Sequence, residues 1–126
     1  MKRLLLDTNV AVWLLLGDRG LVSPCAVQAL EDTNNEVALS AATVWEIAIK
    51  RSLQKVTLPD GWAGALRRLG FDPMPVTAIH AAAVERLPWH HRDPFDRLLV
   101  AQASVEGCML VTADRRLGEY PVETLW

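Results

Sequence analysis

Three short runs of this chain are almost entirely apolar, and segments with helical patterns separate them. They are Arg3 to Leu6, Val37 to Leu39 and Met109 to Thr112. A strand with one face in water alternates polar and apolar residues, whereas a strand covered on both faces is apolar throughout. Strands that alternate with helices are joined by crossover connections, which make them parallel. We therefore predict an α/β fold with a central, mainly parallel sheet and helices on both faces.

The bulk composition is that of an ordinary globular domain, which we expect to span residues 1–126. The chain is 51% hydrophobic, and its formal net charge is −2. A nucleic-acid partner would therefore need a local basic patch or bound metal ions. Asp7 interrupts the first apolar run too early for a signal peptide, and no run reaches the roughly 18 residues of a membrane span. We expect a cytoplasmic protein in which Cys25 and Cys108 are buried free thiols.

Capping residues predict where the helices begin and end. Ser23 precedes a proline and starts a helix to about Asp32, and Ser40 caps a helix from Ala41 to about Leu53. Further helices are expected over Asn9–Leu16, Pro59–Leu69, Thr77–Leu87 and Pro94–Val105, with a weak edge strand over Phe71–Val76 and another strand over Val122–Leu125.

Two aspartates lie just after the ends of predicted strands. Asp7 comes after the first strand, and Asp114 comes two residues after the strand that ends at Thr112. If these strands are parallel, both acids lie at the carboxyl edge of the sheet, where α/β proteins bind their ligands. The alternative is that each aspartate is a turn or cap residue.

Glu46 lies in the middle of an apolar helical stripe. Ala42, Glu46, Ile49 and Leu53 share one face of the predicted helix. Burying a carboxylate there is costly unless it has a partner. That partner is either Lys50, four residues later, or a site at the start of the helix, towards which the side chain leans.

The stretch DPFDR carries two acids at the head of another predicted helix. Asp93 has the features of an N-cap, with Pro94 at the first helical position. Capping explains Asp96 less well, because one cap already serves the helix start, although a negative charge there gains from the helix dipole. This helix also begins at the carboxyl edge of the sheet.

Acids from four distant parts of the chain thus converge on one predicted edge. Two like charges about 4 Å apart repel by roughly 4 kcal/mol at an effective dielectric of about 20. Protonation or bound cations must offset that repulsion. Oxygen ligands without cysteine or histidine favour a hard cation, Mg²⁺ or Mn²⁺, and such ions usually act on phosphates.

Four motifs together resemble the PIN-domain family, and more narrowly its VapC group, the toxins of type II toxin–antitoxin pairs. They are LLLDTNV, SAATVWEIAIK, HRDPFDRLLVAQA and LVTADRRL, and they occur in the family's order over nearly the whole chain. The resemblance implies a three-layer α/β/α domain and a Mg²⁺- or Mn²⁺-dependent endoribonuclease that hydrolyses RNA phosphodiester bonds. It also implies a homodimer and a VapB-type antitoxin as partner.

Carried over residue by residue, the resemblance assigns the catalytic and metal-binding acids to Asp7, Glu46, Asp96 and Asp114. Secondary roles fall to Asn9, Asp93 and Thr112, with Asp93 as either cap or ligand. The basic side chains Arg92, Arg97 and Arg115 flank the predicted edge, where they either contact RNA or pair with neighbouring acids. His90 and His91 are interpreted as surface loop residues, with contact to RNA phosphate as the alternative.

Two other functions remain as alternatives. One is a catalytically silent PIN-like module that only binds a partner or RNA. The other is a phosphatase of the haloacid-dehalogenase type, which also has an aspartate after its first strand. That class needs a second acid two residues later, where this chain has Asn9, so we disfavour it.

Overall fold

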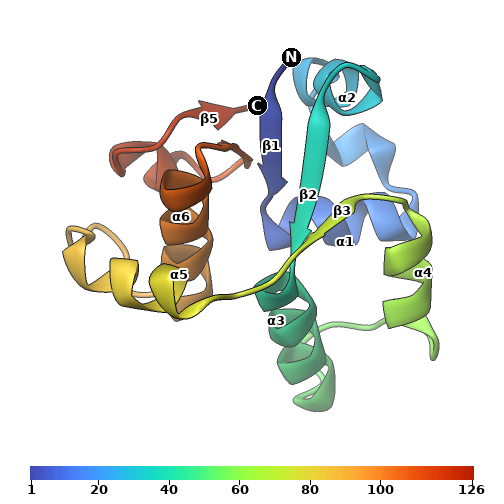
Figure 1. The fold of residues 1–126 in the computed structure, drawn as a ribbon. Helices are drawn as coiled ribbons and strands as arrows, with labels where there is room; N and C mark the ends of the chain where they lie inside the picture. Colours follow the sequence, from blue (N-terminus) through green and yellow to red (C-terminus); the bar gives the residue numbers. More distant parts are fainter.

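A single sheet of five parallel strands forms the centre of the computed structural model, which describes all 126 residues. The strand order is β3-β2-β1-β4-β5 (Figure 1). The strands are β1 (Arg3–Leu6), β2 (Glu36–Ser40), β3 (Asp72–Met74), β4 (Met109–Val111) and β5 (Thr124–Leu125). The predicted parallel α/β architecture is confirmed, and β3 is an edge strand as expected.

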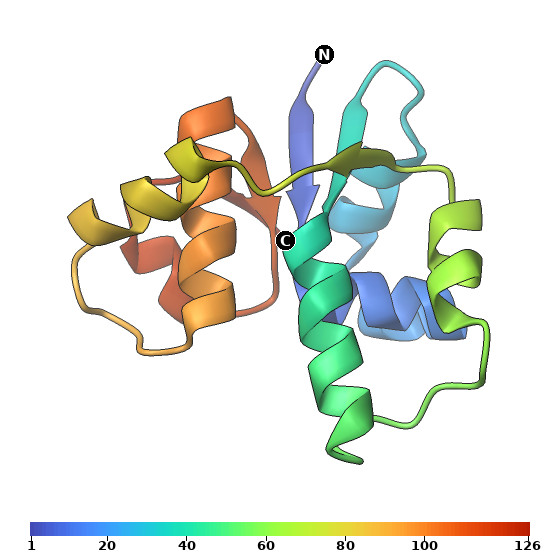
Figure 2. The same cartoon turned by 60° about the horizontal axis from the view of Figure 1, so that its bottom comes forward.

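Helices cover both faces of the sheet. They are α1 (Thr8–Leu16), α2 (Pro24–Glu31), α3 (Ala41–Ser52), α4 (Trp62–Arg68), α5 (Ala78–Ala83) and α6 (Pro94–Glu106), with short 3₁₀ turns η1 (Arg19–Leu21), η2 (Val84–Arg86) and η3 (Arg115–Glu119). Figure 2 shows α1, α2 and α4 on one side of the sheet and α5 and α6 on the other. The helix α3 projects beyond the carboxyl edge.

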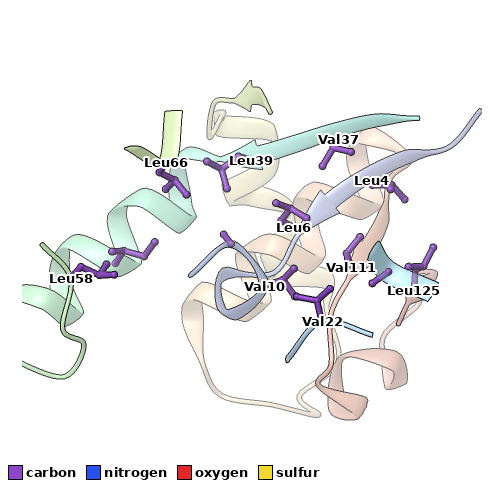
Figure 3. Close-up of a cluster of buried hydrophobic side chains, with 13 residues drawn as sticks. Leu4, Leu6, Val10, Val22, Val37, Leu39, Leu58, Leu66, Val111 and Leu125 are labelled. Carbon is purple, nitrogen blue, oxygen red and sulfur yellow. The ribbon is translucent and has the colours of Figure 1, made fainter. Parts of the chain in front are cut away.

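The two faces of β1 explain why its sequence is apolar throughout. Leu4 and Leu6 pack into one cluster, with Val10 of α1 among their neighbours (Figure 3). Leu5 points the other way and packs with Leu99 of α6. All five of these side chains are 0% exposed. Each burial is worth roughly 1.5–3 kcal/mol, so a polar residue in β1 would be strongly destabilising.

Most helix ends lie where the capping residues predict them. The Ser23 hydroxyl accepts the amide of Ala26 at 3.1 Å, and the Ser40 hydroxyl accepts that of Ala42 at 3.0 Å. Gly17 ends α1 with a φ of 76°, a left-handed conformation that glycine adopts without strain.

Three details differ from the sequence-based expectations. The helix α4 begins at Trp62 rather than Pro59, because Gly61 before it is left-handed, with a φ of 80°. The helix α5 ends at Ala83 and continues as the 3₁₀ turn η2. Cys25 is exposed and only Cys108 is buried, although both thiols are free.

None of the helices has the length and apolar character needed to cross a membrane.

Candidate active site

Asp7 is a buried carboxylate at the end of β1, with 4% of its surface exposed. Its Oδ1 accepts the amide of Thr8 at 2.7 Å, and its Oδ2 accepts the hydroxyl of Thr112 at 2.7 Å. Burial is the main reason that its pKa rises from 3.8 to about 6, and the charges of Asp96 and Glu46 add to the rise. The hydroxyl of Thr112 therefore fixes the orientation of the Asp7 carboxylate.

Glu46 is 3% exposed on α3, and its two oxygens differ. Oε2 is paired with the ammonium of Lys50, so the ion pair considered as an alternative does form. Oε1 is buried and has no hydrogen-bond partner. A buried carboxylate oxygen without a partner costs free energy in a folded protein, which makes it a candidate for binding a cation.

Asp93 and Asp96 both lie at the start of α6. The Oδ1 of Asp93 accepts the amides of Phe95 at 2.8 Å and Asp96 at 3.1 Å, so Asp93 is a helix cap. Its second oxygen takes no part in the cap. The pKa of Asp96 is raised, chiefly by burial, and a hydrogen bond from His91 partly offsets that rise.

His91 is the clearest site residue that the sequence analysis missed. Its Nε2 lies 2.7 Å from Oδ2 of Asp96, and its side chain is only 11% exposed. The expectation of a surface histidine is therefore wrong. The two residues are five positions apart, across the loop before α6, and no sequence periodicity brings such positions together.

Asp114 has a different environment from the other acids. Its carboxylate accepts the Nε and terminal nitrogen of Arg116 at 3.1 Å and 2.8 Å, and it caps η3 through the amide of Arg116. This pairing lowers the pKa of Asp114. The ionised form of Asp114 is thus stabilised and partly exposed, whereas burial disfavours the ionised forms of Asp7 and Asp96.

A polar cavity of about 150 Å³ brings these acids together, and no hydrophobic residue lines it. Its lining is Asp7, Thr8, Asn9, Glu46, Lys50, Asp93, Asp96, Asp114 and Arg116. Five carboxylates against two cations leave a formal charge of −3 if all are ionised. All five acids are candidates from the sequence alone, whereas Lys50 is predicted there only as an alternative partner of Glu46.

The donor set of this cavity fits a hard divalent cation. Its ligand atoms are carboxylate oxygens, its net charge is negative, and Oε1 of Glu46 is left without a partner. One ligand atom from each of His91, Asp93 and Asp96 also lies within 4.8 Å of the others. The sequence predicts oxygen ligands alone, and the structure adds an imidazole that contacts one of the acids, Asp96.

The arginines around this edge are not equivalent. Arg92 and Arg115 are exposed and remain candidates for binding phosphate. Arg97 is 2% exposed, and its guanidinium donates to backbone carbonyls of the preceding loop, including that of Pro88 at 2.8 Å. Neither alternative predicted for Arg97, contact with RNA or pairing with a neighbouring acid, is therefore correct, because its guanidinium donates to carbonyls and to the hydroxyl of Tyr120 inside the protein.

The chain is similar to known proteins over nearly its whole length. The model of the PIN domain matches residues 4–123. Ribonuclease VapC22 of Mycobacterium tuberculosis is 34% identical, over 100% of both chains.

Two solved structures share the fold at lower identity. VapBC2 from Rickettsia felis has a TM-score of 0.73 and 18% identity, over 98% of this chain and 99% of that one. VapBC from Salmonella typhimurium has a TM-score of 0.68 and 16% identity, over 98% and 96%. The full-length match to a VapC protein and the domain match agree with the motifs in the sequence. The chain therefore belongs to the PIN-domain family and, within it, to the VapC group.

Proposed function

We propose that this chain is a metal-dependent endoribonuclease toxin that hydrolyses RNA phosphodiester bonds and is neutralised by a VapB-type antitoxin. The observation that carries the proposal is the polar cavity, in which buried acids crowd together and Oε1 of Glu46 has no partner. The full-length likeness to a protein named as a ribonuclease supports RNA as the substrate class.

Asp7 and Asp96 would hold the principal Mg²⁺ or Mn²⁺, with Glu46 and Asp114 completing the site. A divalent ion bound there would stabilise charge on phosphoryl oxygens and make a water molecule more acidic. Asp93 could add its second oxygen, because the helix cap uses only the first. Asp114 would have to share or release Arg116 to take part.

The protein's own contribution is to hold these carboxylates ready at a cost in stability. Thr112 and the amide of Thr8 fix both oxygens of Asp7. Burial raises its pKa to about 6, so a cation that binds the ionised form also stabilises the fold. Lys50 neutralises one oxygen of Glu46 and limits the repulsion in the cavity.

Substrate binding would fall to polar and basic side chains at the rim. Asn9 lines the cavity and is exposed. Arg92 and Arg115 are also exposed, and they are next in sequence to the cavity residues Asp93 and Asp114. Cations at such positions attract phosphates, and they supply locally the positive charge that the whole chain lacks. A cytoplasmic location follows from this proposal, because that is where an RNA substrate would be met.

Two protein partners are also proposed, a VapB-type antitoxin and a second copy of the chain. Two solved structures that share the fold are VapBC2 and VapBC, and a third, from Klebsiella pneumoniae, is a toxin–antitoxin complex. This chain offers apolar surface that is consistent with such contacts, since Trp45 is 58% exposed and Leu21 is 54% exposed. An apolar groove of about 550 Å³ also lies between α3, α4 and β3, with Phe71 and Leu66 in its lining.

The test is cleavage of a panel of labelled RNAs by the purified chain with Mg²⁺ or Mn²⁺. Cleavage should be lost with EDTA and in Asp96→Asn. If folded Asp96→Asn protein keeps full metal-dependent activity, the assignment of Asp96 is wrong. Calorimetric titration with Mn²⁺ addresses the alternative of a silent module: wild type that binds Mn²⁺ at the acids but cleaves no RNA in the panel would favour it.

A further inference from the structure

Arg97 organises the loop that precedes α6. Its guanidinium donates to the carbonyl oxygens of Val84 at 3.3 Å, Leu87 at 3.3 Å and Pro88 at 2.8 Å. A buried guanidinium needs several acceptors, and this loop supplies them from its backbone. Arg97 therefore fixes the path of the chain over residues 84–88.

A second contact holds the next part of the same loop. The hydroxyl of Tyr120 accepts a hydrogen bond from Arg97 at 3.2 Å and donates to the carbonyl of His91 at 3.3 Å. Tyr120 is 3% exposed, and the ring of Trp89 lies 3.7 Å from the Arg97 guanidinium. The carbonyl oxygen of His91 therefore accepts from two groups, the hydroxyl of Tyr120 at 3.3 Å and the guanidinium of Arg97 at 3.5 Å.

His91 uses this fixed backbone to reach one oxygen of Asp96. Its Nε2 lies 2.7 Å from Oδ2, and an imidazole nitrogen facing a carboxylate acts as the donor. The other oxygen of Asp96 takes no part in this contact. His91 itself is not among the residues that line the polar cavity, whereas Asp96 is.

We infer that His91 is a positioning residue for the metal centre: it orients Asp96 for a divalent cation and is itself held by Arg97 and Tyr120. The inference rests on the proposed function. Partners of this kind fix the orientation of metal ligands, and their loss typically weakens metal binding about 10- to 100-fold. It also explains why Arg97 is buried rather than exposed to substrate.

The competing role is that of a direct metal ligand. One ligand atom each from His91, Asp93 and Asp96 lie within 4.8 Å of one another, which would allow it. Two observations favour positioning. The Nε2 of His91 already faces a carboxylate oxygen, and the side chain is absent from the lining of the cavity.

The test measures Mn²⁺ affinity by calorimetry for wild type, His91→Phe and His91→Gln. Phenylalanine keeps a ring but has no donor, whereas the glutamine amide can donate from nearly the position of Nε2. His90→Phe is the matched control, because His90 lies in the same loop and contacts no acid of the cavity. Its ring meets that of Tyr120 edge-on with the centroids 5.2 Å apart, and its Nδ1 lies 3.6 Å from Glu119. Thermal unfolding without metal checks that each variant is folded.

We expect His91→Phe to weaken Mn²⁺ binding about 10- to 100-fold, while His91→Gln and His90→Phe stay close to wild type. RNA cleavage by His91→Phe should recover largely at saturating Mn²⁺, which a general loss of structure would not allow. Folded His91→Phe with wild-type affinity overturns the inference. So does His91→Gln as weak as His91→Phe, because the ring nitrogen would then bind the metal directly.

The wild-type titration separates this inference from the proposed function. If wild type binds Mn²⁺ and cleaves RNA, and His91→Phe binds Mn²⁺ equally well, only the role of His91 is refuted. Wild type that binds no Mn²⁺ refutes the metal-dependent function and the inference together.

Discussion

Two groups of buried polar side chains flank α6, and they differ in whether their hydrogen bonds are satisfied. In the first, Gln102 joins the hydroxyl of Ser40 to the Nδ1 of His80 at 3.3 Å. His80 also accepts the amide of Thr77 at 3.1 Å and contacts Glu106 at 2.8 Å. Every polar atom of this network that is buried has a partner.

The second group is the acid cavity, where the hydrogen bonds of the buried polar atoms are not all satisfied. Oε1 of Glu46 is the one buried side-chain polar atom without a partner, and the carboxylates around it repel one another. A satisfied network stabilises the fold, whereas crowded and unpaired charges destabilise it until something binds. A buried polar group whose hydrogen bonds are incomplete is therefore a stronger sign of a functional site than a buried polar group whose hydrogen bonds are all satisfied.

Removing a carboxylate from the cavity should give the largest effect on activity. Asp7→Asn keeps the shape of the side chain but removes its charge. We expect RNA cleavage to fall by at least about 100-fold, because even the partners of metal ligands are worth 10- to 100-fold. The measurement is the initial rate of RNA cleavage at several Mn²⁺ concentrations. Activity close to wild type would exclude Asp7 from the metal centre.

The same substitution should stabilise the metal-free protein. The raised pKa of Asp7 means that the native state keeps its proton up to about pH 6, whereas the unfolded chain loses it near pH 3.8. The unfolded state therefore binds fewer protons between these values, and the stability of wild type falls as pH rises through this range.

Because asparagine does not ionise, Asp7→Asn removes this pH-dependent loss of stability, which in wild type is at most about 3 kcal/mol at pH 8. We expect a gain of about 1–3 kcal/mol in the free energy of unfolding at pH 8 and little change at pH 4. Urea unfolding at both pH values, with EDTA present, measures it. An equal effect at both pH values would mean that charge burial is not the cause.

A substitution in the hydrogen-bonded network of Gln102 should lower the stability of the protein instead of raising it. Gln102→Leu removes the acceptor of the Ser40 hydroxyl proton and one of the two donors to the Nδ1 of His80. Such losses cost about 1–3 kcal/mol, so the free energy of unfolding should fall by that amount. Mn²⁺ affinity should not change in the folded variant. A large change in affinity would show that the two groups are coupled through α6.

The smallest effect should come from Tyr120→Phe. This change removes one hydroxyl that donates to the carbonyl of His91 at 3.3 Å, and Arg97 still holds the loop. We expect Mn²⁺ binding to weaken by less than about tenfold, below the effect of changing His91 itself. Calorimetry under the conditions used for the His91 variants gives the ranking. An effect larger than that of His91→Phe would contradict the proposal that Tyr120 acts on the metal centre through His91.

Much of the fold follows from local patterns in the sequence. The apolar run of β1 requires two covered faces, and the caps at Ser23, Ser40 and Asp93 involve residues two or three positions apart. The five acids also follow from the sequence, since each lies next to a strand end or in a helix that starts at the same sheet edge. Parallel strands bring those positions together whatever the details of the loops.

Only the tertiary structure determines how those acids differ. Asp114 is paired with Arg116, Asp7 is desolvated, and Asp96 is held by a histidine that sequence analysis assigned to the surface. Arg97 is buried because carbonyls up to thirteen residues earlier in the chain and the hydroxyl of Tyr120 converge on it. Burial and pairing of a charge depend on atoms that are distant in the chain, and local sequence patterns do not carry that information.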